Sequence, residues 1–263
     1  MQISGARVLI TGASGGIGQA IARAFHVRGA SLVLSGRGGE ALDALAAELK
    51  AQVAAADLAQ VGAPERLAEQ AGEVDILIAN AGLPGTGMLE SFSVEELDRT
   101  LLVNLRAPVV LTRQLLPAMR ERGRGHLLFV SSLAGKAATA HSAPYNATKF
   151  GLRGFALAMR AELQGSGIGV SVLTPGFIRE AGMFAKSGAK LPPGIGTRSP
   201  EDVAQAAVRA VERDLGEVDV APLGLRLASA FAGIAPETAA RVTRLSGGER
   251  IARSLAEGQR TMR

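Results

Sequence analysis

Residues 7–18 read RVLITGASGGIG, and the local pattern of this stretch is the strongest indication of the fold. Arg7 to Thr11 is a short apolar run, which is typical of a buried strand. A helix is expected next, because apolar residues recur at helical spacing from Ile17 until the pattern stops near Gly29. A strand, a glycine-rich turn and a helix in this order form the setting of a dinucleotide-binding site, whereas glycines without that setting can equally mark a flexible loop.

The glycines of this turn suit three separate tasks. Gly12 permits a tight turn, Gly16 lets the backbone come close to a pyrophosphate, and Gly18 allows the helix to pack closely against the strand. The start of the helix then presents unpaired N–H groups to the phosphates. We therefore expect a nucleotide cofactor at this turn.

The residue after the second expected strand indicates which cofactor binds. Ser31 to Ser35 is another apolar run, and Gly36 and Arg37 follow it. An acidic residue here would bind the ribose diol of NAD(H), whereas the Arg37 guanidinium suits the 2′-phosphate of NADP(H). NADP(H) is therefore favoured over NAD(H), with a plain surface role for Arg37 as the alternative.

Polar or small residues also follow the next two expected strands. Gln52 to Ala56 leads to Asp57, which could accept a hydrogen bond from an adenine amino group or could be a turn residue. Asp75 to Ala79 leads to Asn80, Ala81 and Gly82, and such small residues would let a cofactor lie across the strand end.

Tyr145 is the only tyrosine of the chain, and it stands four residues before Lys149 in the first turn of an expected helix. A tyrosine with a pKa of about 10 needs a shift of about 3 units to act near pH 7. A lysine ammonium can supply that shift only in a partly dry cleft. There the phenol could exchange a proton with a carbonyl or alcohol oxygen that Ser132 also holds. The alternative is a half-buried tyrosine beside a solvated lysine.

A helix that begins with the capping box Ser93 to Glu96 carries Asn104, and Pro108 follows four residues later. Because proline has no N–H, the carbonyl of Asn104 is expected to be free and the helix to kink there. A water on that carbonyl could be one end of a proton path from Lys149. The alternative is a proline-bent core helix.

The rest of the chain completes a single expected domain, residues 1–263. Strands are expected at 126–130, 169–174 and 217–220, so that the candidate residues fall at the carboxyl edge of a parallel sheet, where ligands bind. Residues 177–199 lack periodicity and are expected to form a loop. Residues 222–263 form a C-terminal helical tail, with an apolar piece typical of core or subunit interface and then a basic piece. Five apolar residues of the loop suggest a substrate lid: Phe177, Met183, Phe184, Leu191 and Ile195.

Composition excludes several classes of protein. The chain has no cysteine and three scattered histidines, so we expect no disulfide framework and no metal site. The isoelectric point is about 10.2, but residues 241–263 hold six arginines and two glutamates and so account for +4 of the net +5. A broad nucleic-acid-binding face is therefore not expected. We see no signal peptide and no apolar run of about 20 residues, which predicts a cytoplasmic protein without a membrane span.

Together these motifs, in this order and spacing, resemble the short-chain dehydrogenase/reductase family in its compact, non-extended branch, roughly from Ala6 to Gly176. The resemblance implies a single-domain, Rossmann-like, doubly wound α/β fold with about seven parallel strands and helices on both faces. It also implies a catalytic tetrad. Tyr145 would be the acid/base, and Ser132 would hold the substrate oxygen. Lys149 would lower the tyrosine pKa and bind the nicotinamide ribose, and Asn104 would hold a relay water.

The resemblance also implies cofactor contacts and an assembly. Ser14 and Ile17 match glycine-loop contacts, Asp57 and Leu58 match adenine contacts, Asn80 matches a ribose-side contact, and Ile178 matches a backbone contact to the carboxamide. A homodimer or homotetramer is expected.

Three departures bear on specificity. Many NADP(H)-preferring members have a basic residue where this chain has Gly15, so Arg37 carries the preference alone. Glu180 stands where a threonine is common, and a carboxylate beside a pyrophosphate is expected to point away. The tail lacks the glycine-rich ending of the β-ketoacyl carrier-protein reductases, which weakens a role in fatty-acid synthesis and the usual tetramer.

The leading hypothesis is an NADP(H)-dependent oxidoreductase that acts on a small-molecule ketone, aldehyde or secondary alcohol, most simply an apolar one. One alternative is a redox sensor that binds the cofactor without turnover. Another is a membrane-surface or partner-binding protein that uses the tail, because arginines there lie near apolar positions such as Val242 and Leu245.

Overall fold

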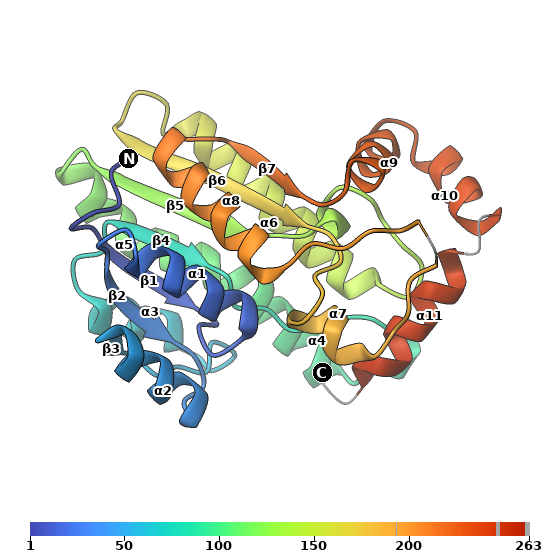
Figure 1. Cartoon of the computed structure of the whole chain (residues 1–263), viewed down its shortest axis with the longest axis horizontal. Helices are drawn as coiled ribbons and strands as arrows, with labels where there is room; N and C mark the ends of the chain where they lie inside the picture. Colours follow the sequence, from blue (N-terminus) through green and yellow to red (C-terminus); the bar gives the residue numbers. More distant parts are fainter. Residues whose placement is uncertain (193, 246–247, 261–263) are drawn as a thin grey trace.

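The computed structural model describes residues 1–192, 194–245 and 248–260. Pro193 of the predicted lid lies outside the described residues, as do 246–247 and 261–263 of the predicted tail. One sheet of seven parallel strands crosses the molecule in the order β3-β2-β1-β4-β5-β6-β7, which confirms the predicted doubly wound fold (Figure 1). The strands are β1 (Arg7–Thr11), β2 (Ser31–Ser35), β3 (Gln52–Val53), β4 (Ile76–Ala79), β5 (Gly125–Val130), β6 (Ile168–Pro175) and β7 (Glu217–Val220).

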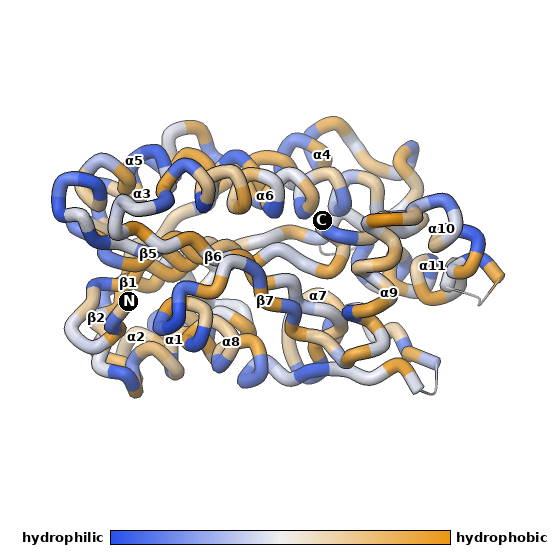
Figure 2. Tube along the Cα trace, turned by 90° about the horizontal axis from the view of Figure 1, so that it is seen from above, coloured by the Kyte–Doolittle hydropathy of each residue, from blue (hydrophilic) through white to orange (hydrophobic). Residues whose placement is uncertain are grey.

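Helices cover both faces of the sheet, and each layer encloses its own apolar core (Figure 2). On one face lie α1 (Gly16–His26), α2 (Glu40–Leu49) and α8 (Pro200–Arg213). On the other lie α3 (Ala63–Ala71), α4 (Val94–Leu101), α5 (Ala107–Glu121) and α6 (Ala143–Glu162). The central strands are buried on both faces because apolar side chains from both helix layers pack against them.

The third strand is shorter than the sequence predicts. We expect a strand over Gln52 to Ala56, but β3 ends at Val53, where the chain lies at the exposed edge of the sheet. Beyond that point Ala56 N still donates to Gly36 O at 2.8 Å. The chain therefore stays beside the end of β2 while it delivers Asp57 to the carboxyl edge.

The helix that carries Asn104 is interrupted where a kink is predicted. Between α4 and α5, residues Leu102–Arg106 form a π-helical turn, and Ala107 N donates to Leu102 O. Such turns are rare and are found mostly at functional sites. Pro108 then lies in the first turn of α5, where a missing N–H leaves no gap in the hydrogen-bond ladder.

The prediction that residues 177–199 form a loop is wrong in part, because Gly182–Ser187 form the short helix α7. The tail forms α9 (Leu223–Ile234), α10 (Pro236–Leu245) and α11 (Gly248–Gln259), and α11 packs against α7. These helices gather beyond the carboxyl ends of the strands (Figure 1). Periodicity could not reveal α7, since a six-residue helix depends on tertiary contacts for its stability. No helix among the described residues is long and apolar enough to cross a membrane.

One histidine lies in the middle of the packed sheet. His126 on β5 is 1% exposed, and its Nε2 lies 2.8 Å from Ser171 Oγ, while Nδ1 has no hydrogen-bond partner among the described residues. Burial lowers the pKa of His126 from 6.5 to about 4 and outweighs the attraction of Asp214. The ring is therefore neutral in the folded protein at neutral pH.

This buried ring predicts acid sensitivity. Between pH 6.5 and about 4 the unfolded chain binds a proton at His126 that the folded chain does not. The free energy of unfolding should therefore decrease as the pH is lowered through this window, and this group contributes at most about 1.4 kcal/mol per pH unit. Urea unfolding of the wild type and of His126→Gln should show a shallower decline in the variant, and parallel declines would contradict the assignment.

Candidate active site

The glycine-rich turn between β1 and α1 is built as a phosphate-binding turn requires. Gly12 has a φ of +65°, which favours glycine, and a Cβ on Gly18 would overlap the Gly12 carbonyl oxygen. Gly15 precedes α1 and can offer no side-chain cap, and the first turn holds no acidic residue. The first N–H groups of α1 are thus free of a capping side chain, as the phosphates of a dinucleotide need.

Two residues that bridge β1 and β4 hold this turn in place. Asn80 Nδ2 donates to Thr11 O at 3.0 Å and to Gly12 O at 3.2 Å. The buried Thr11 Oγ1 accepts from the backbone N–H groups of Asn80 and Ala81. Sequence reasoning assigns Asn80 to the ribose side and misses Thr11, although Thr11 stands directly before the first glycine.

The predicted residues for the adenosine half lie around the ends of β2 and β3. Gly36 packs closely against the glycine turn, since a Cβ on Gly36 would lie 3.0 Å from Ser14 Oγ. The next residue, Arg37, is exposed and therefore stands beside this turn. Asp57 accepts from Ala59 N at 3.1 Å, so it has the turn role that the sequence leaves open, and it lies 3.6 Å from Arg99. Leu58 is buried.

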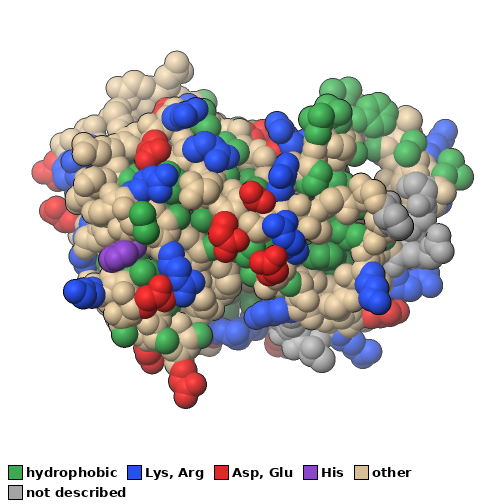
Figure 3. All heavy atoms as spheres, viewed as in Figure 1, with side chains coloured by type: hydrophobic (Ala, Val, Ile, Leu, Met, Phe, Trp, Pro, Cys, Tyr) green, Lys and Arg blue, Asp and Glu red, His purple; other side chains and the backbone are tan. Residues whose placement is uncertain are grey.

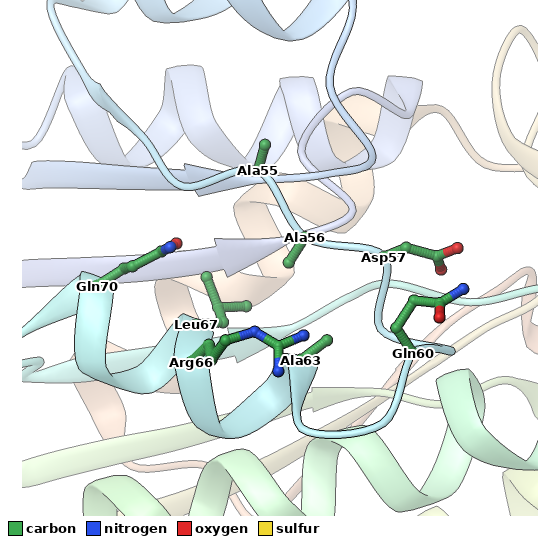
Figure 4. Close-up of a pocket in the computed structure, with 8 residues that line it drawn as sticks. All are labelled: Ala55, Ala56, Asp57, Gln60, Ala63, Arg66, Leu67 and Gln70. Carbon is green, nitrogen blue, oxygen red and sulfur yellow. The ribbon is translucent and has the colours of Figure 1, made fainter.

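A small cavity lies next to the residues predicted to bind the adenosine half, and Asp57 is one of the residues that line it (Figure 4). Its volume is about 160 Å³, and it opens between the end of β3 and α3. Pockets for drug-sized ligands usually measure about 300–1,000 Å³. The cavity is therefore too small for a dinucleotide, and the glycine turn remains the better site. It is lined by Ala55, Ala56, Asp57, Gln60, Ala63, Arg66, Leu67 and Gln70.

The predicted catalytic hydroxyls meet at the carboxyl end of β5. Ser132 follows this strand, and its Oγ accepts from Ala134 N at 3.1 Å and lies 3.4 Å from Pro175 O. A hydrogen bond also joins the side chains of Ser132 and Tyr145, which stands in the first turn of α6. Two hydroxyls that share one point can hold a single substrate oxygen between them.

Lys149 lies behind the tyrosine ring and not at its hydroxyl. Its ammonium is 3% exposed, donates to Val130 O at 2.9 Å and lies 5.6 Å from the centroid of the Tyr145 ring. Burial lowers the pKa of Lys149 to about 8. Val130 is the last residue of β5, and Lys149 lies in the first half of α6. The packing of this helix against the end of the strand therefore fixes the position of the lysine.

The pKa of Tyr145 moves opposite to the sequence expectation. Burial raises the pKa to about 12, and the hydrogen bond with Ser132 only partly opposes this effect. The Lys149 ammonium donates to the carbonyl of Val130 and lies over the tyrosine ring, 5.6 Å from its centroid, and no hydrogen bond joins it to the phenol among the described residues. The phenol is therefore protonated at neutral pH in this arrangement, and it needs a further positive charge in the cleft to act as a base.

Asn104 fixes the loop that follows β4. Its Oδ1 accepts from Leu83 N at 2.7 Å, and its Nδ2 donates to Leu83 O at 2.9 Å and to Thr148 Oγ1 at 3.3 Å. The side chain is completely buried. It lies near Lys149, because a Cβ on Gly82 would be 3.5 Å from Asn104 Oδ1 and 3.7 Å from Lys149 Nζ. The water on its main-chain carbonyl stays a prediction.

The segment after β6 runs across the site. A Cβ on Gly16 would lie 2.5 Å from Ala181 Cβ, and Met183 Cε would be 3.5 Å from a Cβ on Gly82. The rings of Phe177 and Phe184 are in contact, with centroids 5.0 Å apart and planes tilted by 54°. The segment thus reaches from the glycine turn towards Lys149.

Two further predicted residues flank this segment. Ile178 is buried in the core and forms an isolated bridge with Arg198. Glu180 is exposed and pairs with Arg179 at 2.9 Å, with a φ of +69°. Its carboxylate is therefore solvated. Among the described residues, no group of acidic residues or histidines could hold a metal ion.

Comparison with known proteins agrees with this geometry. Residues 6–192 match the family model of the short chain dehydrogenases. A ketoacyl reductase named HetN from Nostoc sp. is 37% identical over 227 residues, which cover 83% of this chain and 79% of that protein. The chain therefore belongs to the short-chain dehydrogenase/reductase family and is an NAD(P)-dependent oxidoreductase.

Two solved structures show the same fold with different cofactors. A short-chain dehydrogenase from Sphingobium yanoikuyae in complex with NADPH is 29% identical, with a TM-score of 0.76, and the match covers 92% of this chain and 95% of that one. A 3-ketoacyl-(acyl-carrier-protein) reductase from Brucella melitensis complexed with NADH is 28% identical, with a TM-score of 0.74, and the match covers 83% and 97%.

Removal of the Asn104 side chain should loosen the site. Asn104→Ala leaves the backbone N–H and C=O of Leu83 without partners, and each such buried group costs about 1–3 kcal/mol. We expect a lower urea midpoint with an unchanged slope. Gln114→Ala, which truncates an exposed amide on α5, is the matched control. Equal midpoints for the two variants would contradict this role for Asn104.

Proposed function

We propose that this enzyme transfers hydride between NADP(H) and a ketone, aldehyde or secondary alcohol, with Tyr145 as the acid/base. The observation that carries the proposal is the meeting of the Ser132 and Tyr145 hydroxyls at the carboxyl edge, with buried Lys149 over the face of the Tyr145 ring. A redox sensor would have no use for this complete set of groups, which favours an enzyme.

Each side chain has a task in the proposed reaction. In reduction, the Tyr145 phenol donates its proton to the substrate oxygen, and Ser132 Oγ holds that oxygen through a hydrogen bond. In oxidation the phenolate takes the proton back. Lys149 and Asn104 keep both groups in position, and the lysine ammonium faces the ribose position. A bound nicotinamide would supply or accept the hydride and, in its oxidised form, would bring a positive charge to the site.

An apolar substrate fits the wall that faces the catalytic pair. Met183 approaches Gly82, and the rings of Phe177 and Phe184 contact each other in the same segment. Apolar walls with a few convergent polar groups are typical of small-molecule sites. Residues 177–199 therefore serve, in this proposal, as the substrate lid.

The preference for NADP(H) rests on Arg37. The guanidinium is exposed at the end of β2, beside Ser14, where the adenosine ribose would lie. No carboxylate stands at this position to bind a ribose diol. One of the two similar structures is in complex with NADPH and the other with NADH, so the proposed preference rests on Arg37 of this chain.

We also propose that the enzyme is a homo-oligomer. An apolar groove of about 380 Å³ lies between α5 and α6 and includes Val109, Leu116 and Phe155. Phe150 and Leu157 of α6 are also exposed. Two copies that pack these helices together would bury this surface, and sedimentation velocity measures the resulting mass.

A second candidate function concerns the tail. One side of α9 exposes the apolar stripe Leu223, Leu227, Phe231 and Ile234, and α10 adds Val242 and Leu245. This apolar stripe forms a patch at one end of the molecule, with arginines near it (Figure 3). The arginines Arg226, Arg241 and Arg244 outnumber the single acidic residue of the two helices, Glu237. An anionic lipid surface could contact both the apolar and the basic side chains of these two helices.

Tyr145→Phe tests the central assignment. The phenyl ring keeps the packing but cannot exchange a proton, so kcat should fall by at least about a hundredfold. Cofactor binding, followed by fluorescence of NADPH, should stay nearly the same. A variant that keeps most of its activity would contradict the proposed mechanism. Wild-type protein that binds NADPH but reduces no carbonyl would favour the redox sensor.

Arg37→Asp tests the cofactor assignment. The carboxylate repels a 2′-phosphate and can bind a ribose diol, so the ratio of kcat/KM for NADPH to that for NADH should fall by about tenfold or more. Arg213→Asp is the control, since it makes the same charge change at an exposed site at the end of α8. An unchanged ratio in Arg37→Asp would refute the preference.

Leu227→Glu tests the lipid surface. The wild type should co-sediment with vesicles that contain phosphatidylserine and not with pure phosphatidylcholine vesicles, and the variant should bind neither. Val27→Glu, an equally drastic change at an exposed apolar residue on α1's far end, should bind as the wild type does. Equal binding of Leu227→Glu and Val27→Glu, or no binding by the wild type, would contradict the second function.

A further inference from the structure

The last helix of the described chain lies directly on the lid. Helix α11 runs beside α7 (Figure 1), and the two helices touch at Gly258. A Cβ on Gly258 would overlap the Ser187 carbonyl oxygen and lie 2.8 Å from its carbonyl carbon. Only glycine therefore allows the backbone of α11 to come this close to the end of α7.

The next residue ties the lid to the opposite wall of the site. Gln259 is 5% exposed, and its Nε2 donates to Met183 O at 3.2 Å. Its Oε1 accepts from Thr86 Oγ1 at 2.7 Å, and Thr86 is buried too. Both ends of the glutamine amide are thus engaged, one on the lid and one on the loop that follows β4.

Both partners of Gln259 belong to the walls of the active site. Thr86 follows Gly85, whose carbonyl accepts from Tyr145 N at 3.3 Å, so this loop is anchored to the helix of the catalytic tyrosine. Met183 carries its side chain towards Gly82 and Lys149. Gln259 therefore lies where the lid and the catalytic wall meet.

The lid needs such a fastening. Helix α7 has six residues and cannot be stable by itself. Its start, Ala181 and Gly182, crosses the glycine turn, where a Cβ on Gly182 would lie 3.3 Å from Ile17 Cδ1. A dinucleotide held at the glycine turn and at Lys149 could leave only if this segment moved away.

We propose that α11 is the latch of the lid and that Gln259 is its positioning residue. The latch holds α7 over the nicotinamide dinucleotide and sets the rate at which the dinucleotide dissociates. It also fixes Met183 as a wall for the substrate. This inference rests on the proposed cofactor site, but the fastening of α7 by α11 can be measured without any cofactor.

Gly258→Ala is the first test, with Gly224→Ala as its matched control. Both are helical glycines of the tail, but no atom lies within 4 Å of a Cβ on Gly224. Displacement of bound NADPH in a stopped-flow fluorimeter should show a severalfold faster dissociation for Gly258→Ala and no change for Gly224→Ala. Amide hydrogen exchange of residues 182–187 in the cofactor-free protein should also be faster in Gly258→Ala alone.

Thr86→Val and Gln259→Met form the second test, because neither change adds bulk at the helix contact. Thr86→Val removes the hydrogen bond between Thr86 and Gln259, and Gln259→Met removes this bond together with the one to Met183 O, so each should speed NADPH dissociation by about three- to tenfold. The double variant should add little to Gln259→Met, since the two residues act as a unit. KM for the carbonyl substrate should rise while kcat stays close to its wild-type value.

The outcomes separate the latch from the proposed function. Equal exchange of residues 182–187 in Gly258→Ala and Gly224→Ala would overturn the latch, even in a fully active enzyme. Equal NADPH dissociation in all variants would overturn its control of the cofactor. Faster exchange in a protein that binds no NADPH would keep the latch and refute the cofactor assignment. Should Gly258→Ala not fold, Thr86→Val gives the same measurements.

Discussion

The constraint on which the site depends is a buried lysine ammonium that has no carboxylate partner among the described residues. Lys149 is held by the carbonyl of Val130 at 2.9 Å, and burial alone lowers its pKa to about 8. An ammonium loses several kcal/mol of hydration when it is buried, and one hydrogen bond does not restore this. The fold must therefore hold the lysine there through the packing of α6 on the end of β5.

Several polar contacts hold the first turns of α6 in place and so help to offset the cost of burying the lysine. Ser131 Oγ donates to the carbonyl of Lys149 at 2.9 Å, and Asn146 Nδ2 donates to Ala134 O at 2.7 Å. Asn104 reaches the same helix through Thr148. Because Ser131 and Ala134 directly follow β5 and Asn104 lies in the π-helical turn before α5, the positions of Tyr145 and Lys149 are set by the elements that pack around the end of β5.

Local patterns made the sheet predictable, together with the gathering of the predicted site residues at its carboxyl edge. The glycine turn after β1, the capping box at Ser93 and the spacing of Tyr145 and Lys149 each depend on residues close in sequence, and the parallel topology brings their strand ends to one edge. Contacts between distant residues could not be read in this way. Nothing near Gln259 indicates that it bonds Met183, and no periodicity marks α7, because both depend on tertiary packing.

The pKa of Tyr145 could not be predicted from the sequence either, because it depends on tertiary contacts. The spacing of Tyr145 and Lys149 puts the residues on one helix face, but it does not tell which atom the ammonium bonds. That ammonium bonds Val130 O, so burial dominates and raises the phenol pKa to about 12. The positive charge that brings the phenol into range must then come from outside the chain, and an oxidised nicotinamide is the group that would carry it.

The most direct measurement uses the fact that the chain has one tyrosine and no tryptophan. Phenolate absorbance during a pH titration of the folded protein reports Tyr145 alone, with and without NADP⁺. We predict a pKa above the usual value of about 10 in the free protein and a clear fall when NADP⁺ is bound. A pKa that is the same in both states would contradict the role of Tyr145 as the acid/base.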